Sequence, residues 1–189
     1  MRPMFIAAAI VSILTPEPTS RFVPAPPPVV FAKKVPYYRC DGCSHNERVT
    51  LEFLQKEVKI NDKYALATIM GNIKQESRFY TDICEGGARV PYDRCHRGGF
   101  GLIQWTTAKR YNGLGNFCTK YNCNPNTIIG QLRYMVNEEE FQNVLPSFKT
   151  PGKSIESYMN SSYNWLGWGI HGDRTTYSYQ YLSQLKPTV

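Results

Sequence analysis

Glu76 stands near the end of a segment whose apolar residues recur at helical spacing. In the sequence GNIKQESRFY, residues 71–80, it follows an apolar stripe that includes Ile69 and Ile73. At roughly 100° per residue, Glu76 lies about 20° from Ile69 on the helical wheel, at the edge of the buried stripe. Partial burial and the negative end of the helix dipole both disfavour the carboxylate form. A carboxylic acid that stays protonated near neutral pH is what general-acid cleavage of a glycosidic bond requires.

A plainer interpretation of Glu76 is an exposed glutamate that pairs with Lys74 or Arg78 at the end of the helix. Taken without its surroundings, the segment favours this interpretation, because most glutamates lie on protein surfaces. The choice between a proton donor and a surface ion pair therefore depends on the other motifs.

A second segment, GGFGLIQW at residues 98–105, carries groups suited to gripping a sugar ring. Its glycines allow backbone N–H and C=O groups to come close to a ligand. Gln104 offers an amide, and Trp105 offers a flat apolar face. A tight turn with a tryptophan packed in the core explains the same residues equally well.

Together the two segments resemble a known family. IMGNIKQESRF followed by GGFGLIQWT is similar to the lysozyme-like domain of phage tail (virion-associated) lysozymes, in which a helix ending in Glu-Ser precedes a G-x-G-L-x-Q-W segment. Lytic transglycosylases have a similar combination. The resemblance extends from about residue 49 to residue 185, and includes QLRYMVNE at 131–138 and a terminal helix that begins at Arg174. The cysteine-bearing insertion 84–95 departs from the family pattern.

The resemblance implies a role for several residues. Glu76 would be the catalytic acid, and Gln104 and Trp105 would line the glycan cleft. We also expect Ser77, next to Glu76, and Phe100, in the second motif, to bind substrate. The expected substrate-binding residues are therefore Ser77, Phe100, Gln104 and Trp105. The implied reaction is cleavage of peptidoglycan strands between N-acetylmuramic acid and N-acetylglucosamine.

A second carboxylate is needed for hydrolysis, either as a base that activates water or as a nucleophile. The candidates are Asp82, Glu85 and Asp93, all in the loop that follows the Glu76 helix. Solvation of the loop or capping of its turns explains these residues as well. A transglycosylase needs no second carboxylate, because a hydroxyl of the sugar itself attacks the anomeric carbon. The resemblance favours hydrolysis, and transglycosylation stays open.

The six cysteines indicate a domain stabilised by disulfides. Their order favours local pairs, Cys40–Cys43, Cys84–Cys95 and Cys118–Cys123, in an exported protein. The alternative is zinc bound by Cys40 and Cys43 with His45, Cys84 or Cys95. A single CxxC is only half of a zinc signature, so we expect no metal site.

Several amphipathic segments position these motifs, and none of the chain shows a convincing alternation typical of strands. The helices that we expect span residues 47–58, 62–77 with Asn61 or Asp62 as cap, about 106 onward, 126–141 with Asn124 and Pro125 as cap and first turn, 151–159 and 173–185. The aromatic, glycine-rich stretch 163–174 is either a cleft wall or core. The sequence predicts a mainly α-helical, lysozyme-like fold (α+β at most) with a glycan-binding cleft.

The chain of 189 residues is long enough for one ordinary core. Residues 1–14 are mostly apolar and too short for a membrane span of about 20 residues, so they resemble a signal peptide or an anchor. Residues 15–45 form a proline-rich linker with the CxxC segment, and residues 46–189 the catalytic domain. The expected location is extracytoplasmic (exported, in the periplasm or cell envelope) or virion-associated.

The formal net charge of +7 favours an anionic partner. Bacterial peptidoglycan is the expected partner, with other virion or tail proteins as further candidates. There is no nucleic-acid motif, no H-E-x-x-H, G-x-S-x-G or Walker motif, and hence no expected specific nucleic acid or cofactor. A non-catalytic module that binds wall or virion, and a basic protein associated with DNA or membrane, are the competing hypotheses.

Overall fold

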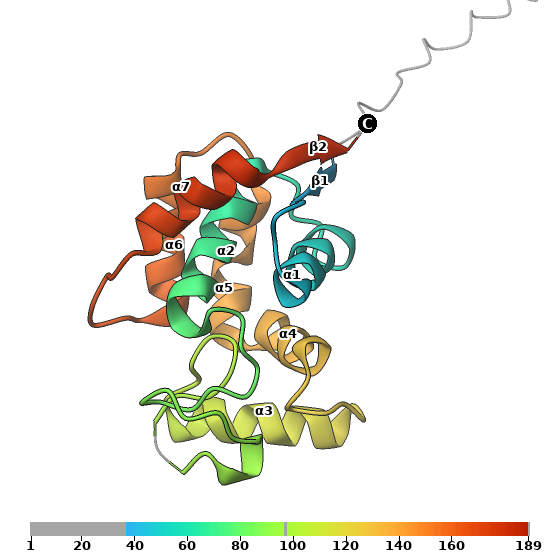
Figure 1. Ribbon diagram of the computed structural model, residues 1–189, viewed down its shortest axis with the longest axis vertical. Helices are drawn as coiled ribbons and strands as arrows, with labels where there is room; N and C mark the ends of the chain where they lie inside the picture. The colour runs from blue at the N-terminus through green and yellow to red at the C-terminus, as the bar shows by residue number, and fades with distance from the viewer. Residues whose placement is uncertain (1–36, 97, 189) are drawn as a thin grey trace, which may run out of the picture. The chain divides into compact units, whose positions relative to one another are not determined.

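The computed structural model describes residues 37–96 and 98–188, and within them the fold is mainly helical. These residues form seven α-helices and a sheet of two short strands (Figure 1). The predicted fold class is therefore confirmed. The apolar segment 1–14 and the proline-rich stretch up to residue 36 lie outside the described residues.

The elements follow one another along the chain with short connections, apart from the loop between α2 and α3. In order they are β1 (Tyr37–Arg39), α1 (His45–Lys56), α2 (Lys63–Ser77), the 3-10 helix η1 (Tyr92–Arg94), α3 (Ala108–Lys120), α4 (Ile128–Asn137), α5 (Glu139–Lys149), α6 (Ile155–Leu166), α7 (Arg174–Gln184) and β2 (Lys186–Thr188).

Helix α2 is the central element and packs against α1, α6 and α7 (Figure 1). Its residues 65–73 are all buried, so the predicted single apolar stripe is embedded in a helix that is covered on every side. Gly71 explains how α7 comes so close. A Cβ atom at this position would lie 2.3 Å from Ser178 Oγ and 2.5 Å from Ser178 N. Two helices can approach this closely only where one of them lacks a side chain.

The two ends of α2 are defined by local hydrogen bonds and backbone geometry. Asp62, one of the two predicted caps, accepts a hydrogen bond from Ala65 N at 2.9 Å. At the other end Arg78 adopts a left-handed conformation with φ of 51°, which ends the helix. Glu76 therefore lies in the last turn of α2, as its position in the sequence predicted.

The short sheet shows that the fold begins before residue 46. Strand β1 pairs antiparallel with β2, with Tyr37 opposite Thr188. Helix α1 begins at His45, and Ser44 and Glu47 form a capping box at its start. The boundary predicted at residue 46 thus lies inside the folded unit. Strands of three residues are too short to show a period in the sequence, so the sheet was not predicted.

The helices in the second half differ from the expected boundaries. Thr127 caps α4, whereas Asn124 and Pro125 lie in the turn that precedes it. The predicted helix 126–141 is two helices, because Glu138 is extended (ψ 149°) between α4 and α5. Ser154 caps α6, so Pro151 does not open this helix.

All six cysteines are paired as expected, in Cys40–Cys43, Cys84–Cys95 and Cys118–Cys123. The Cys84–Cys95 disulfide closes part of the long loop after α2. Two isolated antiparallel β-bridges in the same region pair Ile83 with Arg89 and Cys84 with Phe100. In Figure 1 this loop, in green, lies between α2 and α3. Among the helices that the structure describes, none is long and apolar enough to cross a membrane.

Candidate active site

A cleft of about 700 Å³ lies at the end of α2. Its lining comes from three parts of the chain: the last turn of α2, the segment from residue 99 to Arg110 at the start of α3, and residues 166–174 between α6 and α7. Glu85, from the loop after α2, completes it. Segments far apart in the sequence therefore meet at Glu76.

Glu76 is more enclosed than Glu85, the other carboxylate among the described residues that line this cleft. Its side chain is 15% exposed and forms an ion pair with the buried guanidinium of Arg174. Burial raises the pKa of Glu76, while the positive charges of Arg174 and Arg110 oppose this rise without cancelling it. The carboxyl group thus keeps a proton to higher pH than an exposed glutamate.

Ser77 holds the Glu76 helix against the second motif. Its hydroxyl donates a hydrogen bond to Leu102 O at 2.7 Å and accepts one from Phe79 N at 3.1 Å. The side chain is buried and does not line the cleft. The expectation that Ser77 binds substrate is therefore corrected, because its hydroxyl is engaged in joining the two motifs.

Gln131 of α4 fastens the same two segments from the other side. Its side-chain oxygen accepts a hydrogen bond from Leu102 N at 2.8 Å, and its amide donates to Thr81 O at 2.6 Å. A Cβ atom on Gly101 would lie 2.6 Å from the Gln131 oxygen, so glycine is required where the amide approaches the backbone. The sequence indicated Gln131 only as the first residue of the QLRYMVNE helix motif. Its role in joining the two segments could not be predicted, because nothing in a single sequence shows that an amide side chain is buried.

Gln104 is among the residues that line this cleft. Its backbone is left-handed, with φ of 53°, and its amide donates hydrogen bonds to Gly101 O at 3.0 Å and Ile83 O at 3.3 Å. These bonds orient the side chain toward the cleft that it shares with Glu76.

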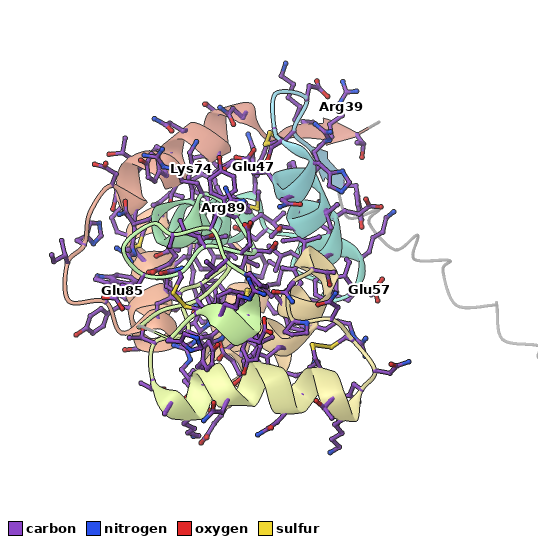
Figure 2. All side chains as sticks on the ribbon, turned by 60° about the horizontal axis from the view of Figure 1, so that its bottom comes forward. Arg39, Glu47, Glu57, Lys74, Glu85 and Arg89 are labelled. Atoms are coloured by element: carbon purple, nitrogen blue, oxygen red, sulfur yellow. A yellow bond between two sulfur atoms is a disulfide. The ribbon has the colours of Figure 1, made fainter. Side chains whose placement is uncertain are left out.

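Of the three candidates for a second carboxylate, Glu85 alone lines this cleft. Its side chain accepts a hydrogen bond from Gly99 N at 3.0 Å. Asp82 accepts one from Arg89 Nε at 2.7 Å, outside the cleft. Asp93 is exposed on η1 and borders a different hollow. Glu85 and Arg89, both labelled in Figure 2, lie at separate places along the loop.

Trp105 and Phe100 belong to the core. Both are fully buried, and neither lines the cleft. Phe100 packs edge-on against Tyr92 and Tyr111, with ring centroids 5.5 and 6.2 Å apart. The expectation that these two residues bind substrate is corrected. The alternative that the sequence left open, a tight turn with a packed tryptophan, describes Trp105.

Glu138 explains why Trp105 points inward. This buried carboxylate accepts hydrogen bonds from Trp105 Nε1 and Trp165 Nε1, both at 3.1 Å. It also binds Arg110 through two bonds, of 3.0 Å from Nε and 2.6 Å from Nη2. Four donors satisfy the buried charge, and the pair holds Arg110 at the rim of the cleft. In the sequence, Glu138 was indicated only as the last residue of the QLRYMVNE motif, and its bonds to the two tryptophans and Arg110 were not predicted.

Trp168, and not Trp105, is the tryptophan that lines the cleft. In the stretch 163–174, Trp165 is buried, whereas Trp168 is half-buried and lines the cleft. The sequence left open whether this stretch is cleft wall or core. Trp165 belongs to the core, and Trp168 belongs to the cleft wall. Because Gly167 ends α6 in a left-handed conformation (φ 64°), the chain turns there, and Trp168 no longer follows the buried face of the helix.

The fold and the cleft define a lysozyme-like protein. A sequence model of the phage tail lysozyme family matches residues 45–171, more than half of the chain, so the protein belongs to this family. No curated protein and no solved structure matches the chain. Membership associates the protein with a lysozyme-like function on peptidoglycan and confirms the resemblance seen in the two motifs.

Proposed function

We propose that this protein cleaves the glycan strands of peptidoglycan between N-acetylmuramic acid and N-acetylglucosamine, with Glu76 as the general acid. The observation that carries this proposal is a half-buried carboxyl group with a raised pKa that lines a cleft of about 700 Å³. A general acid must reach the glycosidic oxygen and still hold its proton. Glu76 meets both requirements when a strand lies in this cleft.

In this mechanism Glu76 donates its proton to the leaving oxygen as the glycosidic bond breaks. Gln104 and Trp168 hold the adjoining sugars, one by hydrogen bonding and the other with its ring. Glu85 is the group available to activate water or to stabilise the positive charge that develops on the sugar. Arg110, held by its ion pair with Glu138, lines the same cleft and restricts its width beside the sugar.

Lytic transglycosylation is the alternative, and one observation favours it. Among the described lining residues, Glu85 is the sole carboxylate besides Glu76, and its side chain is exposed and already bonded to Gly99 N. An enzyme whose substrate supplies the attacking hydroxyl needs no second carboxylate. Mass spectrometry of digested glycan separates the two reactions, since reducing ends indicate hydrolysis and anhydro ends indicate transglycosylation.

The decisive experiment compares Glu76→Gln with Glu57→Gln on purified peptidoglycan. Loss of a general acid costs on the order of 10²–10⁴ in rate. Glu57 is exposed at the end of α1 and does not line the cleft, so its substitution serves as the matched control. A folded Glu76→Gln protein that lyses walls like the wild type would reject the assignment. Wild-type protein that binds the wall without cutting it would instead support a non-catalytic module.

We also propose that the protein works outside the cytoplasm or within a virion. Disulfides persist in oxidising surroundings, and all six cysteines are paired. The net charge of +7 adds a non-specific attraction to anionic wall polymers. Binding to purified wall should therefore weaken as salt rises, since exposed charges are screened over about 10 Å at 0.1 M.

A further inference from the structure

Arg174, the first residue of α7, joins Glu76 to the segment 167–173. Its guanidinium forms the ion pair with Glu76 and also donates hydrogen bonds to two backbone oxygens of that segment, Ile170 O at 2.9 Å and His171 O at 2.6 Å. The Arg174 side chain is only 5% exposed. One buried cation therefore ties the candidate acid to one wall of the cleft.

The same guanidinium lies over an aromatic ring of that wall. Its carbon is 4.5 Å from the centroid of Trp168, within the range of a cation–π contact. Trp168 lines the cleft, and Ile170 beside it is 83% exposed at the cleft edge. A sugar that enters the cleft meets these two side chains, and both belong to the segment that Arg174 holds.

A second contact attaches the segment to the last turn of α2. Gln75, the neighbour of Glu76, accepts a hydrogen bond from Asp173 N at 2.8 Å. Gly172 has φ of 60°, and a Cβ atom there would lie 2.7 Å from the Gln75 amide, so this contact is closely packed. Two successive side chains of α2 therefore hold segment 167–173 in place.

This arrangement opposes general-acid chemistry as long as it persists. A guanidinium paired with a carboxyl group favours the carboxylate, so Arg174 limits the rise in pKa that burial gives Glu76. The other charged groups that face the cleft with Glu76 are Arg110 from α3 and Glu85 from the loop after α2, whereas the lining from the end of α6 is uncharged. Of the two arginines, Arg174 is the one bonded to Glu76.

We propose that Arg174 is a positioning residue that couples segment 167–173 to the protonation of Glu76. In the empty cleft the ion pair favours the carboxylate form of Glu76. A glycan that binds against Trp168 and Ile170 and moves them draws Arg174 away, and the equilibrium then shifts toward protonated Glu76, which takes its proton from solvent. This inference rests on the proposed function of Glu76. Arg174 lies beyond the residues 45–171 that match the family.

The first test is the pH dependence of lysis in Arg174→Met. Without the cation, Glu76 holds its proton to higher pH. The alkaline limb of the pH–activity profile should therefore shift to higher pH by about one unit or more. Arg133→Met is the control, because Arg133 is half-buried on α4 and does not line the cleft. An unmoved alkaline limb in a folded Arg174→Met protein would overturn the proposal.

The second variant, Gln75→Ala, tests the coupling without touching the ion pair. Releasing Asp173 N loosens the segment, so the alkaline limb should move in the same direction, by a smaller amount. Gln180→Ala on the exposed side of α7 is the control. If only Arg174→Met shifts the limb, Arg174 acts as a fixed charge and the coupling is wrong. If Arg174→Met does not fold, Gln75→Ala decides alone.

A binding measurement separates this inference from the proposed function. Calorimetry with a soluble N-acetylglucosamine tetramer, in buffers of different ionisation enthalpy, should show proton uptake on binding to the wild type and none for Glu76→Gln. Binding without uptake, together with an inactive Glu76→Gln, would refute the coupling and leave the acid assignment standing. An active Glu76→Gln protein would instead refute the proposed function.

Discussion

The hydroxyl of Ser77 donates a hydrogen bond of 2.7 Å to the carbonyl oxygen of Leu102. These two residues belong to the two motifs, and they are 25 positions apart in the chain. The bond sets the end of α2, and therefore Glu76, against the segment that carries Gln104. Ser77 thus joins two walls of the cleft.

Replacing Ser77 with alanine should destabilise the protein and lower its activity. The backbone groups of Leu102 and Phe79 would lose a buried partner, which costs about 1–3 kcal/mol. Chemical denaturation and lysis assays measure the two effects. Ser162→Ala is the matched control, because Ser162 is also buried but bonds only to Tyr158 O within its own helix. Equal losses of activity in both variants would contradict a specific role for Ser77.

The two tryptophans 105 and 168 should respond differently to alanine. Trp105→Ala removes a fully buried ring that donates to Glu138, so the free energy of unfolding should fall by about 3–5 kcal/mol. Trp168→Ala should leave most of the stability and weaken binding of soluble glycan fragments roughly tenfold, which is ~1.4 kcal/mol. Thermal melts and fragment binding on both variants decide. Unchanged binding by Trp168→Ala would show that the sugar-binding face lies elsewhere.

Removing the loop disulfide should affect activity more than removing the one at the end of α3. The Cys84–Cys95 bridge restrains the loop that carries Glu85, whereas Cys118–Cys123 does not line the cleft. Each double serine variant should lose a few kcal/mol of stability, on the order of the loop-closure contribution. Melting curves and the rate of wall lysis at a temperature where both variants stay folded distinguish them. A larger activity loss in the Cys118, Cys123 variant would contradict this expectation.

Glu47 should make stability depend on pH. Burial tends to raise its pKa, but hydrogen bonds from Tyr181 and Ser44 and the charge of Lys74 outweigh this and hold the pKa below its usual range. A lowered pKa in the folded state stabilises the protein above the ordinary pKa of glutamate, and this stabilisation is lost as the pH falls through the folded value. Wild type should therefore exceed Glu47→Gln in stability at neutral pH, and the difference should shrink below pH about 4.

Denaturation at a series of pH values measures this difference. Glu57→Gln is a suitable control, because Glu57 is exposed and lies at the opposite end of α1 from Glu47. A constant difference between wild type and Glu47→Gln across the acid range would contradict the prediction.

Local sequence signals were sufficient to predict the helical class, the position of Glu76 in its helix and the pairing of the cysteines. Periodic apolar residues and the cap at Asp62 are local signals, and they predicted α2 well. Bridges closed over short stretches, such as Cys118–Cys123, need only nearby partners. The family resemblance also depended on local motifs, and the family match over residues 45–171 confirmed it.

Which side of each motif faces the cleft depends on long-range packing. Trp105 and Trp168 have the same side chain but differ in burial. Trp105 is held in the core because its indole N–H donates to Glu138, whereas Trp168 leaves the buried face because the chain turns at Gly167. Arg174 meets Glu76 across 98 positions of sequence. Contacts over such distances depend on how helices pack, and helix packing leaves no period or spacing in the sequence that would predict them.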